Sequence, residues 1–199
     1  METIQGRMPI ELNQAELQMR LTSYNHIHLD LGTGDGRFIR HMAEQHPCSF
    51  FIGVDACREN LRANSNRRLP NALFVIASAQ SLPQELNGLI SHITINFPWG
   101  SLLESLLTGD HKLMNSLACI SNSITAVDVR LNGGALAEAG TALEAGAHQI
   151  YNNMLRSGWQ INAPVLMPSH ELRNFPSTWA KRLAFGRDPR AITMSGYSL

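Results

Sequence analysis

The sequence predicts an α/β fold, in which a mostly parallel sheet of seven strands has helices on both faces. Short apolar runs of strand character alternate along the chain with longer amphipathic stretches of helical period. The first apolar run leads directly into the glycine-rich turn "DLGTGDG", residues 30–36, which is typical of the first strand-to-helix junction in such sheets. With 199 residues, of which 44% are hydrophobic, the chain suits a single domain.

The elements follow from local patterns, taken in chain order. A short extension, about residues 1–12, is expected before the first strand. Apolar runs bounded by turn residues predict seven strands, at 26–32, 49–55, 72–78, 91–97, 123–129, 161–167 and 190–198. Apolar residues at helical spacing predict helices between most of them, at 36–46, 58–66, 110–120 and 147–157. The Gly- and Ala-rich insertion at about 131–147 is expected to be a loop with a weak helix.

Composition excludes several classes of protein. No run approaches 18 apolar residues and the N-terminus lacks the features of a secretory signal, so a soluble, cytoplasmic protein without a membrane segment is expected. The three cysteines are widely spaced and the eight histidines mostly isolated, so neither a disulfide framework nor a metal site is predicted. The formal net charge is zero, which argues against an indiscriminate polyanion binder. A monomer is expected.

The basic residues are nevertheless gathered in two stretches. One holds Arg58, Arg62, Arg67 and Arg68, and the other holds Arg173, Lys181, Arg182, Arg187 and Arg190. Nine of the 16 basic residues therefore lie in two short segments. By charge alone the segments are either solvated faces or the contact surface for an anionic partner.

The glycine turn favours one class of cofactor. Its spacing is G-x-G-x-G, at Gly32, Gly34 and Gly36, and it follows Asp30 closely. This differs from the G-x-G-x-x-G turn that seats a pyrophosphate on a helix N-terminus. Acidic residues at 30 and 35 suit a cofactor that carries an ammonium and a sulfonium and has no phosphate. The pattern therefore favours S-adenosylmethionine over a nicotinamide dinucleotide.

Further residues of the expected cofactor site follow the next strands. Asp55 ends the second strand, 19 residues after Gly36, where a carboxylate can accept both ribose hydroxyls. After the third strand, the backbone at Ala79 and the side chain of Gln80 can reach the adenine edge. The expected site is completed by residues of the glycine turn and of the end of the fourth strand, namely Thr33, Gly34 and Asn96.

Two tryptophans occupy unusual places. Trp99 follows the fourth strand in "NFPWG", residues 96–100, and Trp179 lies beside a basic run in "FPSTWAKRLAFGR", residues 175–187. Either the pair sandwiches a nucleobase, or Trp99 closes the floor of the core and Trp179 anchors a connecting helix. The third, Trp159, precedes the sixth strand and is expected in the core.

Several of these motifs resemble one known family. "HIHLDLGTGDGRFIR", "FIGVD", "IASAQSLP", "FPWGSLLE" and "STWAKRLAFGR" closely resemble the 16S rRNA adenine-1408 N1-methyltransferases, the Kam and Npm group that confers aminoglycoside resistance. The resemblance covers most of the chain except residues 131–150. It implies a class I S-adenosylmethionine-dependent methyltransferase fold that acts on 16S rRNA in the 30S subunit.

The resemblance also implies roles for particular residues. The target adenine is held between Trp99 and Trp179. Cofactor contacts are implied for Asp30, Gly32, Asp55, Gln80 and Ser177, and RNA contacts for Arg182 and Arg187. The two arginine clusters add Arg62, Arg67, Arg68 and Arg190 to the expected RNA surface. The chain departs from the family in four respects. It has Gln80 where Glu is frequent, the short segment "RANSNRRLPN" near 62–71 where a longer lysine-rich loop is usual, Asp188 and Pro189 after "FGR" where basic residues are usual, and no Arg or Lys from 131 to 155.

The implied chemistry requires little of the protein. Adenine N1 carries an in-plane lone pair and is unprotonated at neutral pH, so it attacks the sulfonium methyl without a general base, and catalysis is mostly positioning. Three alternatives stay open. An adenine N6-methyltransferase has a [DNS]-P-P-[FYW] motif that "NFPW" resembles, although Phe97 replaces the first proline. The others are a cofactor-binding protein that docks on RNA without catalysis and a small-molecule methyltransferase.

Overall fold

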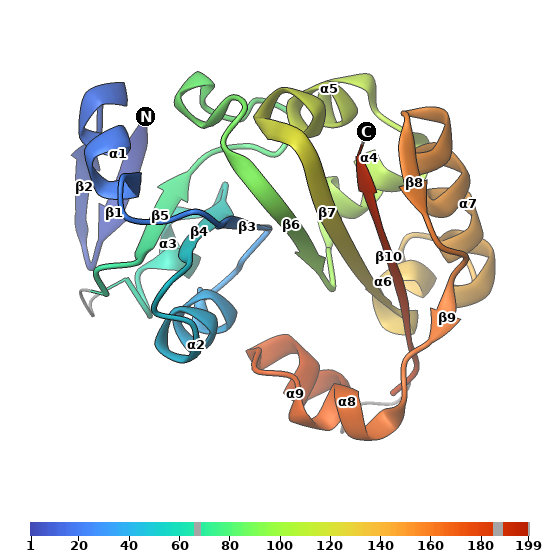
Figure 1. Ribbon diagram of the computed structural model, residues 1–199. Coiled ribbons are helices and arrows are strands. Elements are labelled where there is room, and N and C mark those ends of the chain that lie inside the picture. Colours follow the sequence, from blue (N-terminus) through green and yellow to red (C-terminus); the bar gives the residue numbers. More distant parts are fainter. Residues whose placement is uncertain (66–68, 185–188, 199) are drawn as a thin grey trace.

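A ten-stranded sheet runs through the centre of the molecule, with helices packed against it (Figure 1). The computed structural model describes residues 1–65, 69–184 and 189–198. The strand order is β2-β1-β5-β4-β3-β6-β7-β10-β8, with β9 paired to β10. The strands are β1 (Glu2–Gln5), β2 (Met8–Glu11), β3 (Ile27–Leu31), β4 (Phe50–Asp55), β5 (Ala72–Ile76), β6 (Ile90–Asn96), β7 (Ser121–Asn132), β8 (Trp159–Ile161), β9 (Val165–Leu166) and β10 (Ala191–Ser198).

The parallel part of the sheet consists of β5, β4, β3, β6 and β7. Its strands are apolar and deeply buried, and in β4 every residue from Phe50 to Val54 is buried. Such continuous apolar strands are typical of sheets that are covered on both faces. From β3 the chain builds outward through β4 and β5 and then returns to place β6 on the other side of β3. Ligands of open α/β sheets bind beyond the carboxyl ends of the strands at this kind of reversal.

Helices form most of the connections between the strands. Two of them, α8 and α9, pack on each other beyond the carboxyl ends of β6 and β7, at the bottom of Figure 1. The helices are α1 (Gln14–Leu21), α2 (Arg37–Gln45), α3 (Arg58–Leu61), the 3-10 helix η1 (Gln84–Leu86), α4 (Gly100–Thr108), α5 (His111–Ile120), α6 (Gly133–Glu138), α7 (Leu143–Arg156), α8 (Ser169–Asn174) and α9 (Thr178–Ala184). The predicted α/β class is therefore confirmed. The sheet is mixed and not mostly parallel, because β1, β2, β8, β9 and β10 pair antiparallel with their neighbours.

The sheet has three strands more than the seven predicted. Two of them come from the N-terminal extension, which forms the hairpin β1–β2 and adds to β5 through the pair Thr3 and Val75. The hairpin was missed because β2 is exposed along its whole length and has no alternation of apolar and polar residues. The strand predicted at 161–167 is instead two short strands, β8 and β9. Pro164 lies between them and cannot donate a hydrogen bond to a neighbouring strand.

The Gly- and Ala-rich segment is more ordered than a loop with a weak helix. It forms α6 and the first turn of α7. The Asn132 side chain caps α6 by accepting a hydrogen bond from the Ala135 N–H at 2.8 Å, and Ala135 and Leu136 are buried. Gly146 is buried too, and a Cβ there would stand 2.6 Å from Leu136, so the small residues serve close packing between α6 and α7.

One half of the sheet leaves part of one face open to solvent. In β7, Val127 and Val129 are buried, whereas Ala126 is exposed and Asp128 and Arg130 are half-buried on the opposite face. Strand β10 shows the same alternation, with Met194 buried and Ser195 exposed. This one-sided pattern brings polar side chains of neighbouring strands together on the open face.

Two predictions of absence can be compared with the described residues. Within them, every helix is too short or too polar to cross a membrane. The three cysteines, Cys48, Cys57 and Cys119, are all free and exposed, so no disulfide joins them.

Candidate active site

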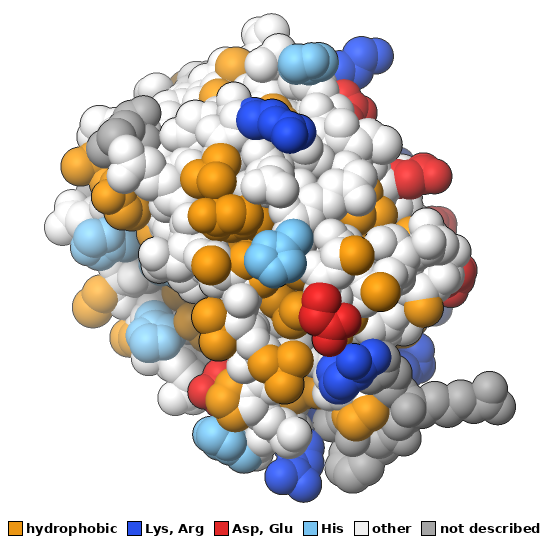
Figure 2. Space-filling view, turned by 90° about the vertical axis from the view of Figure 1, so that its right-hand side faces the viewer, with side chains coloured by type: hydrophobic (Ala, Val, Ile, Leu, Met, Phe, Trp, Pro, Cys, Tyr) orange, Lys and Arg blue, Asp and Glu red, His pale blue; other side chains and the backbone are white. Residues whose placement is uncertain are grey.

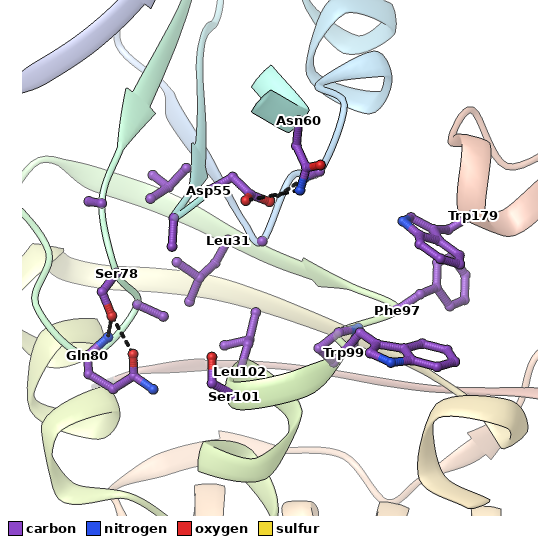
Figure 3. A pocket seen from close by; sticks show the side chains of 17 residues that line it. Leu31, Asp55, Asn60, Ser78, Gln80, Phe97, Trp99, Ser101, Leu102 and Trp179 are labelled. Atoms are coloured by element: carbon purple, nitrogen blue, oxygen red, sulfur yellow. Dashed lines mark hydrogen bonds between the residues drawn. The ribbon is translucent and has the colours of Figure 1, made fainter. Parts of the chain in front are cut away.

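A cleft of about 300 Å³ lies at the carboxyl ends of the central strands (Figure 3). It extends from the ends of β4 and β5, near Asp55 and Gln80, to the two tryptophans Trp99 and Trp179. The lining residues are Leu31, Gly32, Gly34, Val54, Asp55, Ala56, Asn60, Ala77, Ser78, Ala79, Gln80, Phe97, Pro98, Trp99, Ser101, Leu102 and Trp179. Among these lining residues Asp55 is the only one with an ionisable side chain, so the cleft suits a cationic ligand.

The glycine turn is held against β4 by backbone hydrogen bonds. The N–H groups of Gly32 and Thr33 donate to the carbonyl of Val54, at 2.9 and 3.0 Å. The turn requires glycine at Gly36, where φ is +73° and a Cβ would stand 2.4 Å from the ring of Phe74. At Gly34, also at positive φ, the added Cβ would point into the site, 3.9 Å from the Trp179 ring. The glycines thus allow both the bend and a close approach from the cleft.

Asp55 connects the turn to the next loop. Its carboxylate accepts hydrogen bonds from the Gly34 N–H and the Cys57 N–H, both at 2.8 Å, and lies 3.4 Å from Nδ2 of Asn60. A carboxylate has about four acceptor positions, so the two backbone bonds and the longer bond from Asn60 leave room for one further donor, and for a second where a ligand replaces Asn60. Asn60 lines the cleft beside it but was not predicted.

The other side of the cleft is built by β5 and α4. Gln80 lines the cleft as predicted, but its side chain already has protein partners, because Oε1 accepts from Ser78 at 2.5 Å and Nε2 donates to Ser105 at 2.8 Å. Ser101 and Leu102, from the first turn of α4, also line the cleft and were not predicted.

Four of the predicted cofactor residues lie outside this cleft lining. Asp30 lines a neighbouring cavity of about 420 Å³, and Thr33, Asn96 and Ser177 line neither of these two cavities. Thr33 is buried in the glycine turn, Asn96 ends β6, and the Ser177 hydroxyl accepts from the Ala180 N–H at 3.0 Å in the first turn of α9.

Asp30 is a buried carboxyl group, 3% exposed, at the end of β3. Its Oδ1 accepts from the Thr94 hydroxyl and from Nδ2 of Asn96, both at 2.7 Å. Burial raises the pKa of Asp30 to about 6, against the opposing effect of these two hydrogen bonds and of Arg130. Asp30 therefore changes charge close to neutral pH.

The two predicted tryptophans face each other across the mouth of the cleft (Figure 3). Their ring centroids are 5.7 Å apart and the planes are 19° from parallel. Trp99 is the N-cap residue of α4 and is 40% exposed, and Trp179 lies on α9 and is 44% exposed. Trp99 is thus not in the floor of the core. Trp159, predicted as a core residue, is 3% exposed, which confirms that prediction.

The predicted RNA-facing arginines are only partly described. Arg182 lies on α9 with its guanidinium 5.3 Å from the ring centroid of Trp179. Arg62 is exposed and 3.8 Å from Glu59, and Arg190 is exposed and 3.3 Å from Glu144. The remaining three, Arg67, Arg68 and Arg187, lie outside the described residues. Within the described part of the chain, no group of His, Cys, Asp or Glu residues could hold a metal ion.

Comparison of the chain with known proteins identifies a family and several relatives. Residues 2–197 match the family model described as NpmA, 16S rRNA (adenine(1408)-N(1))-methyltransferase. The 16S rRNA (adenine(1408)-N(1))-methyltransferase of Escherichia coli is 31% identical over an alignment of 212 residues, gaps included, that covers 98% of this chain and 97% of that protein.

Solved structures of 16S rRNA methyltransferases have the same fold over the whole chain. The crystal structure of the 16S rRNA methyltransferase KamB is 25% identical, with a TM-score of 0.89, and the match covers 100% of this chain and 99% of that one. A mutant 16S rRNA (adenine(1408)-N(1))-methyltransferase from Catenulisporales acidiphilia, solved with its cosubstrate SAM, matches with a TM-score of 0.85 over 100% of this chain and 96% of that one. It is 19% identical, so this likeness concerns the fold alone. The resemblance found from the sequence motifs is thereby confirmed.

Proposed function

The chain belongs to the 16S rRNA (adenine(1408)-N(1))-methyltransferase family, and we propose that it methylates N1 of adenine 1408 in the 30S subunit, using S-adenosylmethionine. Aminoglycoside resistance is the proposed consequence, and the enzyme is proposed to act as a monomer in the cytoplasm. One observation carries the proposal. Two half-exposed indole rings from separate segments face each other at the mouth of a cleft whose inner end contains Asp55.

Residues in the cleft and beside it fit the cofactor. We assign the ribose hydroxyls to Asp55, where one takes the free acceptor position and the other replaces the long Asn60 contact, and the adenine edge to Ala79 and Gln80. We assign the ammonium to Asp30, which lies outside the cleft lining but directly precedes Leu31 and Gly32 of that lining. A Cβ at Gly34 would point into the site, so its absence leaves room there. When bound, the cofactor supplies an electrophilic methyl group on a sulfonium.

Trp99 and Trp179 are proposed as the walls for the flipped adenine. Two aromatic contacts of about 3.5 Å each need planes about 7 Å apart. The two ring centroids are 5.7 Å apart, so the planes are no farther apart than this and the space between them is too narrow for a base. One wall must therefore shift outward by at least about 1 to 2 Å for the adenine to insert, and two base contacts then replace the single contact between tryptophans.

The remaining chemistry is positioning. Adenine N1 presents its lone pair in the plane of the ring, so flat walls above and below leave it free to point at the methyl group. Among the described residues, no ionisable side chain other than Asp55 lines the cleft, and N1 needs no general base because it is unprotonated at neutral pH. Holding the reacting atoms near 3 Å and in line is the main contribution expected of the protein. The methylated base is cationic, which suits the faces of two indoles.

The RNA surface is proposed to lie around α9, with Arg182 near its centre. Arg187, assigned to the same surface from the sequence, lies outside the described residues. On the face around α7, the residues that the structure describes form no comparable basic cluster. Figure 2 shows that the basic side chains of this face are scattered among hydrophobic and acidic ones, as expected from a segment without Arg or Lys between 131 and 155. Stacking of Arg182 on Trp179 places one positive charge beside the proposed base site.

Reversing two charges tests this surface. Arg182→Glu combined with Arg187→Glu should weaken binding to 30S subunits and lower the slope of log affinity against log salt by about one for each phosphate that the variant no longer binds. The control is Arg20→Glu on α1, at an exposed site far from α9, and it is compared with Arg182→Glu alone, which changes the net charge by the same amount. An affinity for 30S subunits that does not depend on salt concentration, or that is unchanged in the double variant, would exclude an RNA role for these two arginines.

A pH titration tests Asp30. Its raised pKa, about 6, means that the carboxyl group is protonated below that pH and then cannot attract the cofactor ammonium. Affinity for S-adenosylmethionine should therefore fall as the pH decreases from 7 to 5, by up to about tenfold per unit. Asp30→Asn should bind weakly at all of these pH values and lose the dependence. A wild-type affinity that stays constant through this range would show that the ammonium does not contact Asp30.

The function itself is tested on its proposed substrate. Labelled S-adenosylmethionine is incubated with intact 30S subunits and the protein, and the 16S rRNA is then reverse transcribed. N1 methylation blocks Watson–Crick pairing and should stop the transcriptase at position 1408, whereas N6 methylation leaves pairing possible. Incorporation of label without a stop would favour the N6 chemistry, and no incorporation would oppose rRNA methylation by this chain.

A further inference from the structure

Arg130, near the end of β7, contacts several parts of the proposed site at once. Its Nη1 donates to Oδ1 of Asn96 at 2.9 Å, and its guanidinium lies 5.1 Å from the ring centroid of Phe175. Its backbone carbonyl accepts from the Phe97 N–H at 2.7 Å. The side chain is only 20% exposed, so these contacts are largely shielded from water.

The contacts of Arg130 lead to both tryptophans. Phe97 is two residues before Trp99, and Phe175 is four residues before Trp179. The rings of Phe97 and Phe175 meet edge to face with centroids 5.4 Å apart, and the Phe38 ring from α2 stacks on Phe175 with centroids 5.3 Å apart. These three rings, with Arg130, form the place where the Trp99 segment and the Trp179 segment are fixed to each other.

Phe97 has a backbone that needs such support. Its φ is +53°, in the left-handed region that a bulky residue rarely adopts. Conformations of this kind persist only where the surroundings hold them. The hydrogen bond to the Arg130 carbonyl and the packing of the buried Phe97 ring provide this constraint, and they send the chain through Pro98 to Trp99.

The guanidinium is itself anchored on the open face of the sheet. Asp128, two residues earlier on β7, lies 3.6 Å from Nη2 of Arg130. It also contacts Nε2 of His92 at 3.0 Å and the Ser195 hydroxyl at 2.6 Å. Burial alone would raise the pKa of Asp128, but these hydrogen bonds and the charge of Arg130 outweigh it and lower the pKa to about 2. Asp128 is therefore a permanent negative partner for Arg130 at neutral pH.

Arg130 also reaches the cofactor end of the site. By donating to Oδ1 of Asn96, it fixes the orientation of that amide, whose Nδ2 donates to Asp30. A planar guanidinium can cover a ring with its face while donating at its edge, which the ammonium of a lysine cannot do. Arg130 thus combines a stacked contact, a directed hydrogen bond and an ion pair in one side chain.

We infer that Arg130 is a positioning residue for methyl transfer, which holds the segments that carry Trp99 and Trp179 in register with Asn96 and Asp30. This inference rests on the proposed function. Arg130 lines the cavity beside Asp30 and not the cleft, so it acts through Phe175, Phe97 and Asn96.

The test uses two variants and a matched control. Arg130→Met keeps the unbranched apolar stem of the side chain but removes the charge and the donors, and Arg130→Lys keeps the charge without the planar face. Arg156→Met, at the end of α7, is the control for a loss of one arginine elsewhere. Stacked indoles give a coupled circular dichroism signal, and Trp99→Phe and Trp179→Phe identify it because each removes one partner of the pair.

The expected result separates positioning from folding. Both Arg130 variants should weaken the coupled tryptophan signal and lower kcat for 30S methylation about 10- to 100-fold per folded molecule. The KM for 30S subunits should change by less than about threefold, because the RNA-facing arginines are intact. Arg156→Met should behave as the wild type in both measurements.

Two outcomes would overturn the inference. One is a wild-type tryptophan signal together with a wild-type kcat per folded molecule in either Arg130 variant. The other is a loss of activity that equals the loss of folded protein, measured by thermal unfolding of the same samples. If the wild-type protein does not methylate 30S subunits, the proposed function fails, yet the tryptophan signal still shows whether Arg130 sets the geometry of the pair.

Discussion

Trp99→Ala should reduce methylation of 30S subunits about 100-fold or more, and Trp179→Ala should have a similar effect. Each change removes a stacking contact worth about 1 to 3 kcal/mol and also the constraint that aligns N1 with the methyl group. Cofactor affinity should stay nearly normal, because the ribose and ammonium contacts are proposed at the other end of the site. Both rings are at least 40% exposed, so truncation should cost little stability.

The two tryptophans have a control within the same chain. Trp159 is 3% exposed, and Trp159→Phe should lower the melting temperature while leaving activity per folded molecule unchanged. Trp99→Phe and Trp179→Phe should instead retain part of the activity, since a smaller π-face remains. If Trp99→Ala is strongly destabilised and fully active per folded molecule, Trp99 supports the fold and does not hold the adenine.

Asp55→Ala should weaken binding of S-adenosylmethionine by about 100-fold or more, as measured by calorimetry. The substitution removes two charge-assisted hydrogen bonds to the ribose hydroxyls, each worth about 1.5 to 3 kcal/mol. The same substitution also frees the N–H groups of Gly34 and Cys57, so part of the weakening can come from a disordered glycine turn.

A cofactor analogue separates these two causes. A deoxyribose form of the cofactor lacks one of the hydroxyls, so it should bind the wild-type protein more weakly than the natural cofactor does. In Asp55→Ala the two ligands should bind almost equally, because the acceptor for that hydroxyl is gone. An equal penalty for the analogue in both proteins would mean that Asp55 shapes the turn without touching the ribose.

Features that depend on neighbouring residues in the chain were predictable from the sequence. The glycine turn, Asp55 and the "NFPWG" segment each follow a strand directly, and strand order alone brings their ends together at one edge of the sheet. The stretch 161–167 was predicted wrongly although Pro164 marks the break between β8 and β9. The β1–β2 hairpin could not be predicted in the same way, because its pairing with β5 joins residues 72 positions apart, Thr3 and Val75.

Residues whose role depends on tertiary packing were missed. Asn60, Ser101 and Leu102 enter the cleft only because α3 and α4 begin at the strand ends that form it. Conversely, Asp30 and Asn96 were predicted beside the cofactor. In the structure they are hydrogen-bonded to each other and are not part of the main cleft lining, and nothing in the sequence indicates either fact. The sequence signal for Arg130 was its charge within the apolar run "VDVRL". Its contact with Phe175 was not predictable, because the two residues are 45 positions apart in the chain.

The proposal that N1 of adenine 1408 is the methylated atom is tested most directly with 30S subunits in which this adenine is replaced by guanine. The measurement is transfer of labelled methyl from S-adenosylmethionine to the 16S rRNA, compared with unmodified subunits under the same conditions. Guanine carries a proton on N1 and has no lone pair to direct at the methyl group between Trp99 and Trp179. Transfer should therefore fall to background on the altered subunits. Label incorporated equally into both would show that the methylated atom is not N1 of adenine 1408.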